Sequence, residues 1–347
     1  MKPAVLGRLL GKLCLHGSWV LAVLLAAIVA GIAIGETPIS LSLVFQVLAN
    51  KLWGAGFVLD PIDEGIVWNY RLTRALVAAA CGAGLAISGV VLQSLLRNPL
   101  ADPYLLGISA GASTGAVLVA IMGLGAGAVS LSAGAFLGAV AAFALVALLA
   151  RSTGAVSGSG QIILAGIAGS QLFNALTSFL ITKSASSEQA RGIMFWLLGN
   201  LSGVRWQSVG LAVPVVLIGL AVCLWHRRAL DAFMFGSDSA ASLGIPVRQV
   251  QMVLIATVAL VTAVMVSLVG SIGFVGLVVP HAARLLVGVR HGRLIPLSAL
   301  SGALFLIAAD VLSRTAIKGQ VLPVGVITAL IGAPVFAVIL IKAKGGR

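Results

Sequence analysis

Long apolar runs, separated by short polar connections, make up most of the chain. Because about 20 apolar residues cross a bilayer as a helix, these runs predict about ten spanning segments, at residues 17–34, 69–96, 104–122, 130–150, 161–182, 206–225, 248–268, 272–289, 295–316 and 323–342. The eighth contains Gly273, Gly276 and Pro280, so we expect a short or broken helix there. The stretch near 186–199 carries charged residues and predicts a helix at the membrane interface.

The composition supports a membrane protein. The chain is 60% hydrophobic and 9% charged, with a mean hydropathy of +1.15, whereas a soluble domain is about 25% charged. We therefore predict an all-α, polytopic membrane protein in which residues 1–347 form a single transmembrane domain. The net charge of +13 comes from Lys and Arg that gather in the connections on one side, as in cytoplasmic loops. This pattern predicts cytoplasmic termini and no nucleic-acid partner.

One polar connection, residues 97–104, differs from the others by its two prolines. Pro99 and Pro103 cannot both lie inside one regular helix, since each removes an amide donor and clashes with the preceding turn. Backbone without helical hydrogen bonds survives at membrane depth only where protein buries it or where it lines a water-filled path. We therefore interpret this connection as part of a transport path.

The sequence lacks a recognisable site for energy conversion. Its nearest match to a phosphate-binding loop is one residue short and has Leu13 where a Ser or Thr would hold magnesium. Asp310 has Arg314 one turn further on, which predicts a local ion pair rather than a proton relay. We find no cluster of polar residues in the spans, which disfavours a membrane-embedded enzyme. The energy is then expected from a partner protein, and a proton-coupled secondary transporter is the alternative.

The polar segment 226–248 is a place where such a partner can bind. Ser237 or Asp238 is expected to cap a short helix that ends at Gly244, before Pro246. The segment also holds apolar residues that need a cover, which is either a soluble ATPase or the membrane surface: Phe233, Met234, Phe235 and Leu243.

Three arginines at the outer ends of predicted spans run against the charge bias: Arg71, Arg74 and Arg314. They either reach towards lipid headgroups or form a basic platform for an acidic partner surface. The residues alone leave both interpretations open.

Several sequence blocks resemble the permease subunits of type II ABC importers, the FecCD family, which includes vitamin B12, haem and ferric-siderophore permeases. The similarity covers nearly the whole chain from about Arg71 on. The blocks that carry it are Arg71-Leu-Thr-Arg74, Gly84-Leu-Ala-Ile-Ser-Gly89, Asn98-Pro-Leu-Ala-Asp-Pro103, Leu106-Gly-Ile-Ser-Ala-Gly111, Phe195-Trp-Leu-Leu-Gly199, Leu243-Gly-Ile-Pro246, Gly270-Ser-Ile-Gly-Phe-Val-Gly-Leu-Val-Val-Pro-His281, Leu322-Pro-Val-Gly325 and Gly332-Ala-Pro-Val-Phe336. Where many members have a Glu before Leu-Pro-Ile-Gly, this chain has Val321.

The resemblance implies the type II importer fold, with ten helices in each of two copies, and a chain that binds no cofactor and is not itself an enzyme. It implies two ATPase subunits, which use ATP and Mg²⁺ and dock on a coupling loop at about 230–246, with Asp231, Gly236, Ser237, Asp238, Ser239, Ala240, Ala241, Leu243 and Gly244. A periplasmic or surface binding protein is expected to dock on Arg71, Arg74 and Arg314. The cytoplasmic gate is expected at Asn98, Leu100, Ser159 and Gly160, where Gly160 replaces a hydroxyl residue.

The resemblance also implies a location and a class of substrate. We expect a multi-pass protein in the bacterial inner membrane, with lipid around the two copies. Sparse charged and aromatic side chains in the spans fit a large chelate better than a small ion. Haem, a ferric siderophore and cobalamin remain as substrates, and family frequency favours an iron-bearing chelate.

Overall fold

The computed structural model describes residues 3–122, 130–152, 159–184 and 186–344. These residues form helices joined by short connections, with one isolated bridge between Ile317 and Gln320. The helices are α1 (Pro3–Ala33), α2 (Leu41–Trp53), α3 (Pro61–Gly65), the π-helix η1 (Ile66–Leu72), α4 (Thr73–Leu95), the 3-10 helix η2 (Pro103–Leu106), α5 (Ile108–Met122), α6 (Leu131–Ser152), α7 (Ser159–Ser184), α8 (Ser187–Leu197), α9 (Trp206–Trp225), α10 (Arg227–Phe233), α11 (Ser237–Ser242), α12 (Val247–Val269), α13 (Val275–Val287), α14 (His291–Thr315) and α15 (Val324–Lys344).

Each of the apolar runs predicted from the sequence contains a helix, which confirms the all-α membrane fold. Among the described residues, 6 helices are long and apolar enough to cross a membrane, at Pro61–Leu95, Leu131–Ala150, Gly160–Lys183, Trp206–Trp225, Val247–Val269 and His291–Thr315. The expected short helix in the eighth run is α13, which has 13 residues and contains Pro280. The helix expected near 186–199 is α8, and its location at the membrane interface stays a prediction. The apolar pattern did not predict α2.

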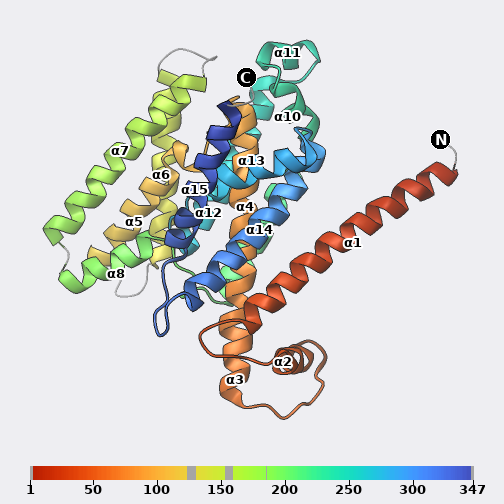
Figure 1. Cartoon of the computed structure of the whole chain (residues 1–347). Helices are drawn as coiled ribbons and strands as arrows, with labels where there is room; N and C mark the ends of the chain where they lie inside the picture. Colours follow the sequence, from red (N-terminus) through yellow and green to blue (C-terminus); the bar gives the residue numbers. More distant parts are fainter. Residues whose placement is uncertain (1–2, 123–129, 153–158, 185, 345–347) are drawn as a thin grey trace.

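Helix α4 runs through the centre of the molecule, where it packs against α9, α12, α13 and α14 (Figure 1). Helices α5, α6 and α7 pack on one another beside this central group. Helix α1 meets the bundle through its second half, where Ile28 and Ile32 are buried, while its first half extends away from the other helices in Figure 1.

Glycines bring the central helices into backbone contact. A Cβ added to Gly82 of α4 would overlap the carbonyl oxygen of Gly302 in α14, and one added to Gly89 would overlap that of Gly276 in α13. Gly111 of α5 meets Gly138 of α6 in the same way. Such contacts hold membrane helices together, because packing rather than the hydrophobic effect stabilises helix pairs inside a bilayer.

The two ends of the molecule differ. Helix α1 begins and α15 ends at the end that carries α10 and α11, whereas α2 and α3 lie at the opposite end (Figure 1). Ser40 caps the start of α2, where its Oγ accepts the N–H of Leu43 at 3.2 Å, and Gly54 caps its end, where a φ of +66° suits glycine. A common end for the two terminal helices agrees with an even number of spans.

Two helix breaks lie side by side inside the bundle. The first, residues 97–107, separates α4 from α5, and the second, residues 270–274, separates α12 from α13. Tyr104 joins them, since its hydroxyl donates to Ile272 O at 3.0 Å and accepts from Ile272 N at 2.9 Å. A helix of the length of α13 extends about 20 Å, less than the hydrocarbon core of about 30 Å. The second break therefore lies within the thickness of a bilayer.

Candidate functional site

The polar segment 226–248 contains the predicted coupling loop and is called the coupling segment below. It consists of two short helices, α10 and α11, rather than the single helix that the sequence predicted. Leu230 and Phe233 of α10 are buried against the bundle, whereas Phe235 and Leu243 are 81% and 73% exposed. The residue that precedes α11 as its N-cap is Gly236, so the prediction of Ser237 or Asp238 as the cap is wrong. Glycine fits there because its φ is +109°. The segment thus presents large apolar side chains at its tip, on a base that is packed into the protein.

A hydrogen-bonded triad joins this segment to two spanning helices. Asp231 Oδ1 accepts from the backbone N of His291 at 2.9 Å and lies 2.7 Å from its Nδ1. On the other side of the ring, His291 Nε2 lies 2.6 Å from Ser94 Oγ. The carboxylate also satisfies a free N–H at the positive N-terminal end of α14. Asp231 is therefore a tie between α10, α14 and α4, and not part of the exposed tip.

A second contact links the coupling segment to the break after α4. The Nη1 of Arg97 would lie 3.3 Å from a Cβ placed on Gly236, so the guanidinium group rests against this glycine. Arg97 itself has a φ of 48°, which is unusual for a residue other than glycine. The coupling segment is thus linked to the end of α4 in two ways, through His291 to Ser94 and directly to Arg97, which follows the helix.

Two of the expected gate residues, Asn98 and Leu100, come directly after Arg97 in the first break. Asn98 Oδ1 accepts the N–H of Leu100 at 2.9 Å, which folds the backbone into a tight turn and directs Leu100 outward, where it is 46% exposed. Asp102 then accepts the N–H of Tyr104 at 2.8 Å and starts η2.

The other two expected gate residues lie at the start of α7. Gly160 is exposed, and no neighbour would meet a Cβ placed there. Ser159 is the first residue of α7. In Figure 1 this end of α7 lies at the same end of the molecule as α10 and α11. Their role in a gate stays a prediction.

Gln93 is a functional candidate that the sequence analysis missed. Its Nε2 donates to Gly276 O at 3.2 Å and to Ala101 O at 3.3 Å, and its Oε1 accepts from Arg284. One side chain on the last turn of α4 therefore holds the first helix break against α13. Gln93 directly precedes Ser94, so the last turn of α4 contacts the first break through one side chain and His291 through the next.

The three arginines that the sequence analysis assigned to a basic platform for a partner are buried in this structure. Arg71, Arg74 and Arg314 are 3%, 1% and 3% exposed. Arg74 Nε donates to Asp310 Oδ1 at 2.6 Å, and Arg314 Nε donates to its Oδ2 at 3.1 Å, which confirms the local ion pair predicted on α14. A buried carboxylate between two arginines holds α4 and α14 together at this end.

Two of these arginines also bind the carbonyl end of α1. Arg71 Nη1 donates to Ile32 O at 2.9 Å, and Arg314 Nη2 donates to Gly31 O at 2.9 Å. The last carbonyls of a helix have no partner within the helix and carry a partial negative charge. The guanidinium groups therefore fasten α1 to the bundle, and sequence spacing could not show that they point inward.

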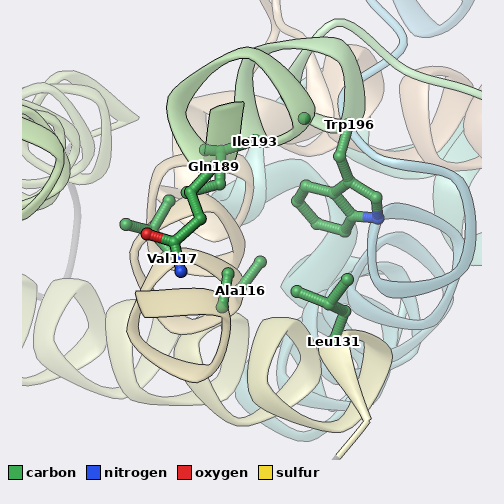
Figure 2. Close-up of a pocket in the computed structure, with 8 residues that line it drawn as sticks. Ala116, Val117, Leu131, Gln189, Ile193 and Trp196 are labelled. Carbon is green, nitrogen blue, oxygen red and sulfur yellow. The ribbon is translucent and has the colours of Figure 1, made fainter. Parts of the chain in front are cut away.

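Two pockets lie beside α5. The apolar one has a volume of about 280 Å³ and is lined by α5, α8 and the start of α6, with the ring of Trp196 facing Ala116 and Leu131 (Figure 2). The other has a volume of about 450 Å³ and gathers hydroxyl and amide groups from α5, α7 and both helix breaks; its lining includes Tyr104, Ser109, Ser113, Ser170, Asn174, Ser178 and Ser271. The sequence analysis found no cluster of polar residues in the spans, and the lining of this second pocket shows that there is one.

The pockets and breaks show no arrangement typical of a metal centre. Among the described residues, no group of three or more His, Cys, Asp or Glu side chains could hold a metal ion. The structure shows instead a helix bundle with two central breaks. A polar pocket is lined by both breaks together with α5 and α7, and the coupling segment contacts the first break at Arg97.

Comparison with known proteins decides the family. Residues 23–342 match the model of the FecCD transport family. The chain belongs to the FecCD transport family. Members of this family are permeases of ABC transporters, in which ATP hydrolysis lies in separate subunits, so the chain is not itself an enzyme. Family membership favours an ABC importer over the proton-coupled alternative.

Relatives with this FecCD architecture cover most of the chain. An uncharacterised ABC transporter permease, YvrB of Bacillus subtilis, is 41% identical over 329 residues, 93% of each chain. A cobalamin import system permease, BtuC of Halobacterium salinarum, is 44% identical over 82% of this chain and 75% of its own length. The vitamin B12 import permease BtuC of Escherichia coli is 37% identical over 88% of this chain and 92% of its own.

Solved structures agree with the FecCD fold. One, an inward-facing transporter assigned to the metal-chelate type of ABC transporter, is 30% identical, has a TM-score of 0.80 and covers 93% of this chain and 97% of its own. PsaBC of Streptococcus pneumoniae, at 23% identity and a TM-score of 0.54, shares the fold. The chain is therefore an ABC importer permease of the class that handles metal chelates and cobalamin.

Proposed function

We propose that two copies of this chain form the membrane path of an ATP-driven importer in the bacterial inner membrane. Two ATPase subunits bind at the end that carries α10 and α11, which is then cytoplasmic together with both termini. A substrate-binding protein delivers the cargo at the opposite end, where α2 and α3 lie. The buried arginines give no contact surface there, so the docking residues of that protein are to be sought among exposed side chains.

The observation that carries this proposal is the construction of the coupling segment. Its tip exposes Phe235 and Leu243. Large apolar side chains that are exposed together are typical of a surface that binds a partner. Its base is tied through Asp231 and His291 to α4 and α14. A surface that is built to be covered and is rigidly connected to the bundle suits a partner that pushes on the bundle.

The proposed mechanism follows from these connections. Nucleotide binding and hydrolysis in the ATPases move α10 and α11, and the Asp231 triad and Arg97 transmit the movement to the last turn of α4. The first break, with Asn98 and Leu100, then opens or closes the cytoplasmic side of the path. Rigid-body rocking of two packed copies is a common form of alternating access, because packed helices shift as units.

For the substrate, we propose a large metal chelate, with a cobalamin-type corrinoid as the first candidate. Its support is that two relatives, at 44% and 37% identity, are named for cobalamin or vitamin B12 import. The second candidate is an iron-bearing chelate, either haem or a ferric siderophore, and its support is the solved transporter of the metal-chelate type at 30% identity.

The partner interaction is tested by replacing the exposed apolar tip. We expect Phe235→Ser and Leu243→Ser, made together, to abolish co-elution of the ATPase from size-exclusion chromatography, because burying each such side chain is worth about 1.5–3 kcal/mol. Phe57→Ser is the control, since Phe57 is 48% exposed in the connection between α2 and α3. Co-elution that survives the double replacement would refute the proposed docking surface.

A further inference from the structure

We propose that the polar pocket between α5 and α7 is a subsite that binds uncharged carboxamide or hydroxyl groups of the cargo. This inference rests on the proposed function and adds a specificity-determining site to it. The pocket joins side chains from separate segments: Ser109 and Ser113 of α5, Ser170, Asn174 and Ser178 of α7, and Ser271 of the second break.

The polar residues of α7 form one stripe along the helix. Ser170, Asn174 and Ser178 are each four residues apart, so they lie above one another on the same face. Leu172, at 50% exposed, lies on a different face of the helix. A helix that met only lipid would have no use for an amide at Asn174, since an unpaired amide in an apolar environment costs about 2–7 kcal/mol. The stripe is therefore built to face water or a polar ligand.

The hydroxyl that α7 uses for packing is a different one. Thr177 Oγ1 donates to Phe173 O at 2.9 Å and lies 2.8 Å from Thr114 Oγ1 of α5, where both threonines are buried. By contrast, the side chains of Ser170, Asn174 and Ser178 make no hydrogen bond to any other described residue. Their donors and acceptors are free for a ligand.

The far wall of the pocket is held in place by the helix breaks. Ser109 Oγ donates to Ser271 Oγ at 2.9 Å, and the Tyr104 hydroxyl forms hydrogen bonds with the backbone O and N of Ile272. Transporters place their sites where broken helices meet inside the membrane, since such breaks offer polar groups without exposing them to lipid. The pocket occupies such a meeting point.

The lining of the polar pocket favours uncharged groups of the cargo over charged ones. Among the described residues that line the pocket, none is charged. Lys183, near the C-terminal end of the same helix, lies over the ring of Phe179 at 5.6 Å, which is outside this lining. A carboxylate that leaves water needs a paired cation, whereas amide and hydroxyl groups need only neutral partners. The pocket therefore suits a neutral, amide-bearing chelate and not an anionic one.

The size of the pocket limits what enters it. A volume of about 450 Å³ is within the range of small-molecule sites, yet a large metal chelate does not fit inside it entirely. The subsite therefore holds peripheral groups of the cargo, while the rest of the cargo lies in the path between the two copies.

The test compares two probes in vesicles that contain the complete importer. Cyanocobalamin carries neutral amide side chains, whereas haem carries two carboxylates. We expect the wild-type importer to take up cyanocobalamin in preference to haem. Asn174→Leu, and independently Ser178→Ala, should raise the half-saturating concentration of cyanocobalamin by about fivefold to tenfold, as expected for one lost neutral hydrogen bond. Size-exclusion chromatography of each variant verifies that it is folded.

Gln171→Leu is the matched control, because Gln171 is an exposed polar residue of α7 outside the pocket lining. Unchanged uptake by both pocket variants, or an equal loss in Gln171→Leu, would overturn the subsite while leaving the proposed function intact. Preference for haem in the wild type would overturn the charge argument. ATP-dependent uptake of neither probe would refute the proposed corrinoid or haem cargo and the subsite with it.

Discussion

The tie between the coupling segment and the bundle makes a sharp prediction for Asp231. Its Oδ1 accepts the backbone N–H of His291 and faces its ring nitrogen, at 2.9 and 2.7 Å. Asp231→Ala would leave these groups of the buried His291 without their partner. An unsatisfied buried donor costs about 1–3 kcal/mol. Because the Asp231 side chain is 37% exposed, water replaces part of the bond, and we expect about 1–2 kcal/mol.

A loss of this size loosens α10 from α14 without unfolding the protein. The tip at Phe235 and Leu243 is unchanged, so the ATPase should still bind. We therefore expect the variant importer to hydrolyse ATP while moving less cargo per ATP, by about fivefold to thirtyfold if the weakened tie reports directly on coupling. Asp231→Asn keeps an acceptor oxygen and should lie between the wild type and Asp231→Ala.

The assay measures uptake and ATP hydrolysis in the same vesicles, so that their ratio does not depend on the amount of protein. Glu188→Ala is the control, because Glu188 is an exposed acid on another short helix, α8. A ratio that is unchanged in Asp231→Ala would refute the tie as a coupling element, and so would an equal drop in Glu188→Ala.

Two further predictions concern stability. Arg74→Ala removes a partner of the buried Asp310 and should destabilise the protein by about 3–5 kcal/mol, measured as a lower midpoint of thermal unfolding in detergent, with the exposed Lys318→Ala as control; equal midpoints would contradict the buried pair. Gly82→Ala places a Cβ against a backbone carbonyl and should reduce the yield of folded protein, whereas Gly210→Ala, with open space around it, should stabilise α9 by up to about 1 kcal/mol. Similar yields for both would argue against the close helix contact.

The sequence was sufficient to place a helix in each predicted run because most of these runs are long and apolar, and six of the described helices are long enough to span a membrane. It also indicated that α13 is short, since Pro280 and nearby glycines interrupt the run. It missed α2, Leu41–Trp53, because this helix has only 13 residues and leaves the apolar chains of Phe45 and Trp53 exposed. A short helix that covers little of the core has a weak periodic signal.

The site was less accessible from the sequence, because its contacts join residues that are far apart in the chain. Asp231 and His291 are 60 positions apart, and neither lies in a pattern that predicts the other. The side-chain direction of the three arginines was equally out of reach, because it depends on where α1 ends. The polar pocket could not be predicted for a similar reason. Its serines and its asparagine come from separate segments, and none of these segments shows an unusual pattern by itself.

In the proposed importer, this chain provides the path and separate ATPase subunits provide the energy. The most direct measurement is uptake of cargo into sealed vesicles that hold the chain, the binding protein and an ATPase variant that binds ATP without hydrolysing it. We predict that accumulation falls to the level seen without ATP. Accumulation that persists with the inactive ATPase, or with the chain alone, would refute the dependence of transport on ATP hydrolysis in a partner.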